Sequence, residues 1–373
     1  MNREVLIAGA GPTGLAAALF LAERGIKARI IDPAPEGSAH SKALGVNPRT
    51  LELLEPTGVT EAILAKALRM VAMKLHQDDR QLAEVSIDPI SQGAAFPMVI
   101  LPQSETEKLL AAALAKRGIK PERGLTLTAL EQDAGGVDYT LTDADGGELR
   151  GRAAIVLGAD GAHSAVRHLL GVGFPGSAFP EAWQIIDCAI DRPNPAPHGY
   201  VDFQREGPWV ALPFDSKTWR LIGPGGDLTQ RLPKGWTLKK VLWRSEFHIS
   251  HRIADKLAVG RVCLAGDAAH IHSPLGARGM NLGIEDAYVF AACAADALAS
   301  DSSDRLADYG RIRRDADAAV VRRVESLTKA IRARGPAARL LRKWLIPRVA
   351  HSPKTAQGFI RTATGLDHPV RLN

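Results

Sequence analysis

The residues with the clearest chemical role stand near the start of the chain, where three glycines are spaced Gly9-x-Gly11-x-x-Gly14. Such glycines permit a tight turn, close approach of the backbone to a pyrophosphate and close packing of a helix on a strand. Asp32 follows Gly11 by 21 residues, a separation at which a carboxylate can accept the ribose hydroxyl protons. The pattern predicts a dinucleotide site; a glycine turn that serves packing alone is the alternative.

A second candidate group is His270-Ile271-His272, because residues two apart on a strand share one face and could bind a metal ion together. A third ligand is not apparent, and zinc sites use three or four protein ligands. We therefore expect no metal here, and a structural or pocket-edge role for both histidines. Another histidine could serve as base for a phenolic proton, but none is singled out and the catalytic base is left unassigned.

The glycine turn needs a strand before it and a helix after it. Residues 4–8 are expected to form a buried strand, 15–24 an alanine- and leucine-rich helix ended by Gly25, and 28–32 a second strand. The uncharged run 5–22 has the length of a membrane span or signal peptide, but its three glycines and proline favour strand, turn and helix. The chain therefore opens with a βαβ unit.

Two later helix starts carry local signals. Asn47-Pro48 reads as an N-cap followed by proline at the first helical position, and Ser104 with Glu107 forms an S-x-x-E capping box. After residue 173, short alternating apolar runs broken by Pro, Gly and Asp predict a separate antiparallel sheet. Four large residues of this sheet could face a substrate: Trp209, Pro213, Phe214 and Trp219. For each of them, packing in the sheet core is the simpler role.

Composition narrows the class of protein. With 373 residues and 46% apolar content, the chain can bury one large core or two modest ones, so a cofactor domain joined to a substrate domain is expected. Cys188, Cys263 and Cys293 are far apart in apolar surroundings, which is typical of free thiols in a reducing cytoplasm.

The formal charge of +6 resides in the tail. From residue 331 onward, nine Lys/Arg against Asp367 give +8, which leaves −2 for the rest. A basic tail can contact an anionic membrane surface, but a solvated helical face packed on the body is the simpler interpretation. Because no basic groove with interleaved aromatic residues is present, nucleic acid is not an expected partner.

Two further motifs follow the glycine turn in order. Residues 158–167 (GADGAHSAVR) carry an Asp-Gly pair, and residues 260–270 (GRVCLAGDAAH) lead into 274–283 (PLGARGMNLG). In these motifs the chain from residue 1 to about 330 resembles the group A FAD-dependent aromatic monooxygenases, the family of para-hydroxybenzoate hydroxylase. The resemblance implies an α/β fold: a Rossmann-like, GR2-type FAD-binding domain, an inserted antiparallel-sheet substrate domain and C-terminal helices.

The expected domains follow from this order. The FAD-binding domain is discontinuous (1–69, 98–172 and 254–330), the substrate domain comprises 70–97 and 173–253, and 331–373 forms a basic C-terminal helical segment. By resemblance, Asp267 binds the ribityl chain, Gln103 lies near FAD, and Lys42 replaces a family arginine without its bidentate fork. The candidate cofactor-binding residues are Gly9, Gly11, Pro12, Thr13, Gly14, Asp32, Lys42, Gln103, Asp160, Gly161, Asp267, Gly279, Met280 and Asn281.

The helix that begins near Gly279 has an independent physical rationale. Reduced flavin tends to carry negative charge around N1 and C2=O, so unpaired N–H groups near Met280 and Asn281, together with Arg278, would stabilise it. Arg278 and Pro274 are therefore expected near the flavin. The alternative for Arg278 is a solvent-facing loop cation.

By resemblance, NADPH or NADH transiently reduces FAD, dioxygen adds at flavin C4a, and the hydroperoxide hydroxylates a small aromatic or phenolic substrate. The alternatives are another FAD enzyme of this fold, such as a halogenase or an isoprenoid reductase, and a non-catalytic redox sensor or membrane adaptor. The W-x-W-x-I-P segment expected of a halogenase does not occur. We expect a cytoplasmic monomer or homodimer.

Overall fold

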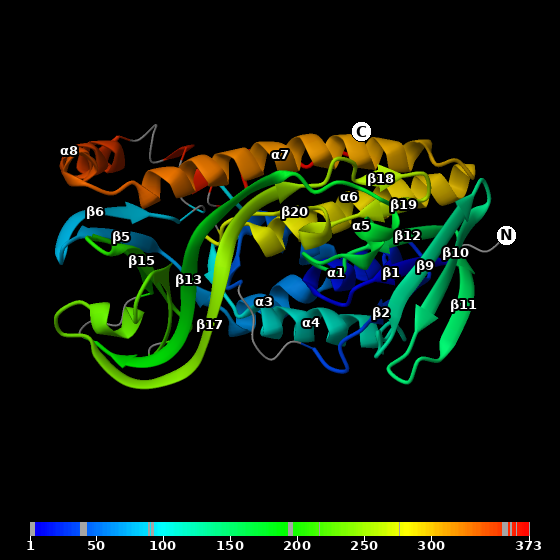
Figure 1. Ribbon diagram of the computed structural model, residues 1–373, viewed down its shortest axis with the longest axis horizontal. Helices are drawn as coiled ribbons and strands as arrows, with labels where there is room; N and C mark the ends of the chain where they lie inside the picture. Colours follow the sequence, from blue (N-terminus) through cyan, green and yellow to red (C-terminus); the bar gives the residue numbers. More distant parts are fainter. Residues whose placement is uncertain are drawn as a thin grey trace.

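The structure is a computed structural model that describes residues 4–37, 43–88, 90, 93–192, 197–215, 217–275, 277–352, 357–358, 360–362 and 364–372. Its elements are arranged around two large sheets and a long pair of C-terminal helices (Figure 1). The helices in these ranges are α1 (Pro12–Ala22), α2 (Pro48–Leu54), α3 (Val59–Lys66), α4 (Gln103–Ala115), α5 (Ala165–Leu169), α6 (Gly279–Ser300), α7 (Asp304–Arg332) and α8 (Pro336–His351), with 3-10 turns η1 (Glu55–Thr57), η3 (Leu228–Arg231) and η4 (Gly266–Ala268).

A six-stranded sheet forms the base of the predicted cofactor site. Its order is β18 (Ala258–Val259), β19 (Val262–Leu264), β12 (Ile155–Gly158), β1 (Val5–Ala8), β2 (Ala28–Asp32) and β8 (Glu122–Arg123). All neighbours are parallel except β18 and β19. Every residue of β1 is buried, as expected for a central parallel strand covered on both faces.

The chain opens as the βαβ unit that its hydrophobic pattern predicts. Helix α1 begins at Pro12 rather than Leu15, because proline supplies the backbone angle of a first helical residue and needs no N–H partner there. None of the described helices combines the length and the apolar character needed to cross a bilayer.

An eight-stranded sheet forms the second body. Its order is β20 (His270–Ile271), β17 (Thr237–Ile253), β13 (Gly176–Asp191), β16 (Thr218–Pro224), β15 (Gly207–Pro213), β14 (His198–Gln204), β5 (Ala72–Gln77) and β6 (Arg80–Ser86). The long strands β13 and β17 curve from this sheet towards α6 (Figure 1). Strands from 70–97 and 173–253 share the sheet through the β5–β14 pair, and on this basis we propose the domain division given above.

The remaining described strands form two small sheets. One is antiparallel, with the order β11 (Glu148–Ala153), β10 (Gly136–Thr142) and β9 (Thr126–Asp133), and the other has the order β3 (Gly45–Val46), β7 (Val99–Ile100) and β4 (Leu68–Arg69). Helix α7 runs along α6, and the Tyr309 hydroxyl donates to the Leu264 carbonyl at 2.7 Å. This bond joins α7 to the six-stranded sheet.

The two faces of the eight-stranded sheet have different partners. Trp209 and Trp219, each 1% exposed, pack together with Trp236 on one face, so the core interpretation of these tryptophans is confirmed. On the opposite face, Phe214 packs in a cluster that includes Ala277, which precedes α6. The second face therefore borders the predicted flavin region, and we call it the inner face.

Candidate functional site

The protein's own packing requires two glycines of the turn. Gly9 has φ +106°, and a side chain there would overlap the Ala159 carbonyl of the neighbouring chain segment. A side chain at Gly14 would overlap the Gly9 carbonyl oxygen. The absence of a side chain at these two positions allows β1, the turn and α1 to pack closely.

Gly11 differs from them, because a side chain there would meet no described atom within 4 Å. Gly11 is also the N-cap of α1, which has neither a side-chain cap nor an acidic residue in its first turn. The first N–H groups of the helix therefore lack a side-chain cap, and the positive helix end lies beside the open position at Gly11. This cradle fits the pyrophosphate of a dinucleotide such as FAD.

Asp32 is held against the same turn. Its Oδ2 accepts from the Ala10 N–H at 2.7 Å and its Oδ1 from the Ala34 N–H at 2.9 Å, while Arg123 Nη1 lies 3.3 Å from Oδ1. A carboxylate keeps further lone pairs for hydroxyl donors. The position at the carboxyl end of β2 suits ribose recognition.

The Thr13 side chain lies between α1 and α6. A side chain at Gly266 or Gly283 would collide with its hydroxyl group. The side chain of Thr13 thus packs two elements together, and binding of a cofactor by its backbone N–H stays a prediction.

The Asp-Gly pair lies after β12, at the same edge of the sheet. Asp160 Oδ2 accepts from the Val166 N–H at 3.1 Å, whereas its Oδ1 is buried without a partner among the described residues. Burial raises the pKa of this carboxyl group. Gly161 has φ +82°, and no described atom lies within 4 Å of the side-chain position. An unpaired buried acceptor beside open space suits a hydroxyl donor of a ligand.

Gln103 is the first residue of α4, and its side-chain amide binds another side chain. Its Nε2 donates to Glu107 Oε1 at 2.8 Å. The predicted capping box is therefore wrong: the N-cap is Pro102, two residues before Ser104, and Glu107 binds Gln103 instead of the backbone. Burial raises the pKa of Glu107. Lys42 lies outside the described residues.

Asp267 follows β19 and is exposed in η4, between buried neighbours. It shares the carboxyl edge of the sheet with the turn at Gly11 and the loop at Asp160, since β1, β12 and β19 are adjacent and parallel. Ligands of open α/β sheets bind at this edge. The structure thus brings the predicted residues of all three motifs to one side of the molecule.

Helix α6 also begins without a side-chain cap and without an acidic residue in its first turn. The Gly279 and Met280 N–H groups are therefore free of helical partners by geometry. The Asn281 side chain is occupied: Oδ1 accepts from the Asn47 N–H and Thr50 Oγ1, and Nδ2 donates to the Gly45 and Ala277 carbonyls. Asn281 thus positions the helix start against β3 and α2.

Arg278 is buried and turned towards the C-terminal segment. Its Nη1 donates to the Thr362 carbonyl and to Asp367 Oδ1, the latter at 3.0 Å, so the solvent-facing alternative is wrong. Nε and Nη2 are buried without partners among the described residues. The Asp367 side chain is largely buried, but bonds from His368 and Arg278 hold its pKa well below the usual range. Proximity of Arg278 to the flavin stays a prediction.

Pro274 forms a tight turn before α6. Its carbonyl accepts from the Ala277 N–H at 3.0 Å, and Ala277 has φ +50°, a left-handed conformation that is unusual for alanine. This turn sets the direction from which the chain enters the helix. Contact of Pro274 with the flavin is likewise still a prediction.

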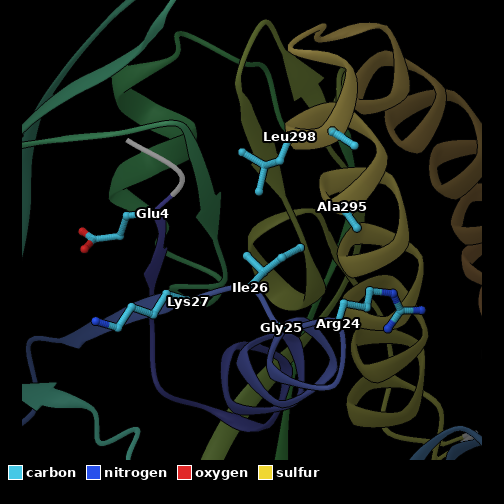
Figure 2. Close-up of a pocket in the computed structure, with 8 residues that line it drawn as sticks. Glu4, Arg24, Gly25, Ile26, Lys27, Ala295 and Leu298 are labelled. Carbon is cyan, nitrogen blue, oxygen red and sulfur yellow. The ribbon is translucent and has the colours of Figure 1, made fainter. Parts of the chain in front are cut away.

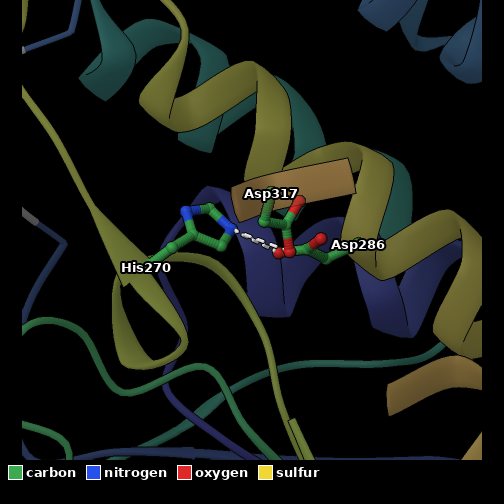
Figure 3. A group of neighbouring side chains, drawn as sticks. All are labelled: His270, Asp286 and Asp317. Carbon is green, nitrogen blue, oxygen red and sulfur yellow. Dashed lines mark hydrogen bonds and ion pairs between the residues drawn. The ribbon is translucent and has the colours of Figure 1, made fainter. Parts of the chain in front are cut away.

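A buried ion-pair network lies behind the helix start (Figure 3). His270 from β20 lies beside Asp286 from α6 and Asp317 from α7, with His270 Nε2 2.8 Å from Asp286 Oδ2. Burial lowers the pKa of His270, but the charges of Asp317 and Asp286 outweigh it and raise the pKa to about 9.

The geometry of this network favours ion pairing over metal binding. Arg313 donates to Asp286 Oδ1 at 2.6 Å and to Asp317 Oδ1 at 2.7 Å. Arg313 and the protonated His270 already supply two positive charges opposite the two carboxylates that would hold a metal. Asp286 also accepts from the Gly266 N–H at 2.9 Å, so the network positions the residue that precedes Asp267.

His272 is a buried neighbour of the helix start. Its Nδ1 donates to the Ser273 carbonyl at 2.9 Å, and its Nε2 has no partner among the described residues. Burial lowers the pKa of His272 to about 3. It is therefore a neutral imidazole with an open acceptor nitrogen close to Gly279.

The inner face of the large sheet meets the turn before α6 through apolar residues. Met73, Leu212 and Phe214 come from the sheet, and Leu275 and Ala277 come from the turn. This contact region, between the sheet and the predicted flavin site, provides apolar walls suited to an aromatic ring.

One functional candidate on that face was not anticipated. Arg220 and Asp187 are register partners on β16 and β13, and Arg220 Nε and Nη2 each donate to Asp187 at 2.7 Å. The guanidinium carbon lies 5.1 Å from the centre of the Phe214 ring. The signal was available in the alternation of residues 183, 185 and 187, which places Asp187 on an otherwise apolar strand face.

A hollow of about 540 Å³ lies elsewhere, lined by Arg24, Ile26, Lys27, Ala295 and Leu298 among others (Figure 2). It sits at the C-terminal end of α1, roughly 16 Å from the glycine turn by helix rise. Because it borders the amino ends of β1 and β2, it is separate from the cofactor edge.

Comparisons with known proteins agree with this geometry. A family model described as FAD binding domain matches residues 2–222 and 227–324. The chain is 32% identical over 323 residues to 6-methylpretetramide 4-monooxygenase of Streptomyces rimosus, covering 82% of this chain and 58% of that protein. It is 33% identical to 12-dehydrotetracycline 5-monooxygenase/anhydrotetracycline 6-monooxygenase of the same species, covering 86% and 68%.

The fold has a solved counterpart as well. The crystal structure of p-nitrophenol 4-monooxygenase from Pseudomonas putida superposes with a TM-score of 0.87 at 22% identity, covering 97% of this chain and 98% of that one. The predicted α/β architecture, with a Rossmann-like FAD-binding part and a sheet domain, is confirmed.

Proposed function

The chain belongs to the group A FAD-dependent aromatic monooxygenases, and from this premise we propose that it uses NADPH or NADH and dioxygen to hydroxylate a small aromatic or phenolic substrate. The observation that carries the proposal is the shared sheet edge, where the open N-termini of α1 and α6 flank Asp160 and Asp267. The chain spans 58% of the length of the first relative above, so the activity of the whole protein is part of the proposal.

Bound FAD would supply two-electron reduction and reaction with dioxygen. The N-terminus of α1 would hold its pyrophosphate, and Asp32 would accept the ribose hydroxyls. Asp267 and Asp160, with the open side of Gly161, would hold the ribityl region. The Gly279 and Met280 N–H groups would face the pyrimidine ring and stabilise negative charge on it.

We place the substrate between the inner face of the sheet and the turn that begins at Pro274. Leu212, Phe214 and Leu275 would exclude water from an aromatic ring there, and exclusion of water protects reactive intermediates. The Asp187–Arg220 pair gives this face a fixed polar group for orienting a substrate. The names of the relatives, which refer to polycyclic and phenolic compounds, support an aromatic ligand.

The nicotinamide cofactor would bind transiently, since the described residues contain one glycine-turn dinucleotide site. Three buried free cysteines support a cytoplasmic location, and we propose a monomer or homodimer there.

Anaerobic stopped-flow reduction of the FAD-loaded protein by NADPH and by NADH, across a panel of phenols and polycyclic aromatics, tests this function. We expect at least one aromatic compound to accelerate flavin reduction. Protein that binds no flavin would contradict the cofactor assignment. Flavin that is reduced equally with every compound, and yields no oxygenated product in air, would favour a reductase.

A further inference from the structure

Helix α8 turns two of its four Lys/Arg residues, Arg339 and Arg342, towards the protein. Arg339 pairs with Asp78, its Nη1 lying 3.0 Å from Oδ1, and packs over the β5–β6 turn. Arg342 Nη2 donates to the Ile331 carbonyl at 3.2 Å, and its guanidinium lies 4.6 Å from the Phe203 ring centre. The face of α8 that contacts the body thus carries two of the cations of the helix.

The opposite face of α8 is apolar and open to solvent. Leu340 is 71% exposed and Trp344 is 56% exposed. The complete set of exposed large apolar residues on this helix is Leu340, Leu341, Trp344, Leu345 and Val349. This arrangement is the reverse of an ordinary surface helix, whose apolar stripe faces the core. Two of the four Lys/Arg of α8, Lys343 and Arg348, are exposed as expected, but an apolar face beside them is also exposed and is available to a partner.

Charge decides which partner fits. Residues 331–352 contain six Lys/Arg and no Asp or Glu. Lys343 and Arg348 are exposed beside the apolar face, and the Arg348 guanidinium lies 3.9 Å from the Trp344 ring centre. Two copies of α8 packed together would bring these cations face to face without an acid to compensate them. An anionic surface would instead be attracted.

We propose that α8 binds the surface of an anionic phospholipid bilayer, lying in the plane of the interface. The apolar side chains would enter the boundary between headgroups and acyl chains, and Lys343 and Arg348 would contact lipid phosphates. Tryptophan is enriched at this depth, because its ring is apolar and its N–H is polar. Helix α8 lies at one end of the molecule, beside β6, where a planar surface can reach it (Figure 1).

Co-sedimentation of the full chain with vesicles tests this proposal. The probes are vesicles of phosphatidylcholine containing phosphatidylglycerol, and vesicles of phosphatidylcholine alone. We expect binding to the first kind, weakened roughly tenfold or more by the double substitution Leu340→Ser and Trp344→Ser. The matched control is Val241→Ser with Leu242→Ser, which removes comparable exposed apolar side chains from β17 and is expected to bind like the wild type.

Three outcomes would overturn the proposal. The wild type could stay in the supernatant with both vesicles, the α8 variant could bind as well as the wild type, or both vesicle types could be bound equally. Analytical ultracentrifugation adds a fourth: a wild-type dimer that the α8 substitutions convert to a monomer would assign the face to self-association. Thermal melting of each variant verifies that the fold is retained.

Discussion

At the scale of single residues, the three glycines of the turn have different roles. Gly9 and Gly14 are needed because carbonyl oxygens of the protein occupy the space of a side chain, whereas the space beside Gly11 is open. The G-x-G-x-x-G pattern predicts the turn but does not separate these roles. The distinction depends on the neighbouring segment at Ala159, which is remote in sequence.

This difference predicts opposite effects for two alanine substitutions. Gly11→Ala should leave the stability of the FAD-free protein nearly unchanged, because Gly11 has an ordinary φ of −77° and an open side-chain position. It should weaken FAD binding by about tenfold or more, since the methyl group would enter the pyrophosphate space. Fluorescence titration with FAD and thermal melting of the FAD-free protein measure the two effects.

Gly14→Ala should instead destabilise the FAD-free protein itself, by about 2 kcal/mol or more, because the methyl group collides with backbone. If both variants melted like the wild type and bound FAD equally well, the pyrophosphate position proposed for the turn would be wrong.

At the scale of elements, local signals predict starts and ends but not the contacts between distant segments. The N-cap at Asn47 is confirmed, since its Oδ1 accepts from the Thr50 N–H at 2.8 Å. The capping box at Ser104 failed because Gln103 competes for the Glu107 side chain. The bond between Arg278 and Asp367 spans 89 residues, and no periodicity in the sequence indicates it.

The Arg278–Asp367 contact predicts a large effect for a conservative change. Asp367→Asn would leave the buried guanidinium of Arg278 without its countercharge, at a cost of about 3 kcal/mol in the free energy of unfolding. Asp138→Asn removes a partner of Arg152 from a solvent-exposed pair and should cost much less than Asp367→Asn. Chemical denaturation measures both, and equal costs would show that burial of the first pair is immaterial.

The network around His270 predicts a pH dependence of stability. Its pKa in the folded protein, about 9, lies above the ordinary 6.5, so the folded state binds the proton more tightly than the unfolded chain. The resulting stabilisation, about 3 kcal/mol, is fully present below pH 6.5 and lost as pH rises towards 9.

The substitution His270→Gln keeps a donor for Asp286 but removes the titrating group. The free energy of unfolding should fall between pH 6.5 and 9 in the wild type and fall much less in this variant. Urea denaturation at several pH values supplies the comparison. An unchanged slope in the variant would assign the pH dependence to other groups.

At the scale of the whole molecule, two sheets meet at the turn that leads into α6. The motifs predict that the cofactor residues share one edge of the parallel sheet, because each motif follows a parallel strand, but they do not predict where the second sheet meets that edge. The sequence does not predict which sheet residues face the flavin, since the alternation along β13 and β16 allows either face until the two bodies are packed. The sequence likewise does not indicate that the apolar face of α8 is exposed, because the tail's charge suggested a solvated charged face.

The central claim is that one atom of dioxygen is transferred to an aromatic substrate. Incubation of the FAD-loaded protein with NADPH or NADH, a substrate that accelerates flavin reduction, and isotopically labelled dioxygen tests it most directly. We expect a hydroxylated aromatic product that carries one labelled oxygen atom, in proportion to the reductant consumed. Consumption of the reductant with all oxygen released as peroxide, or product oxygen derived from water, across the whole substrate panel would show that the protein is not a monooxygenase.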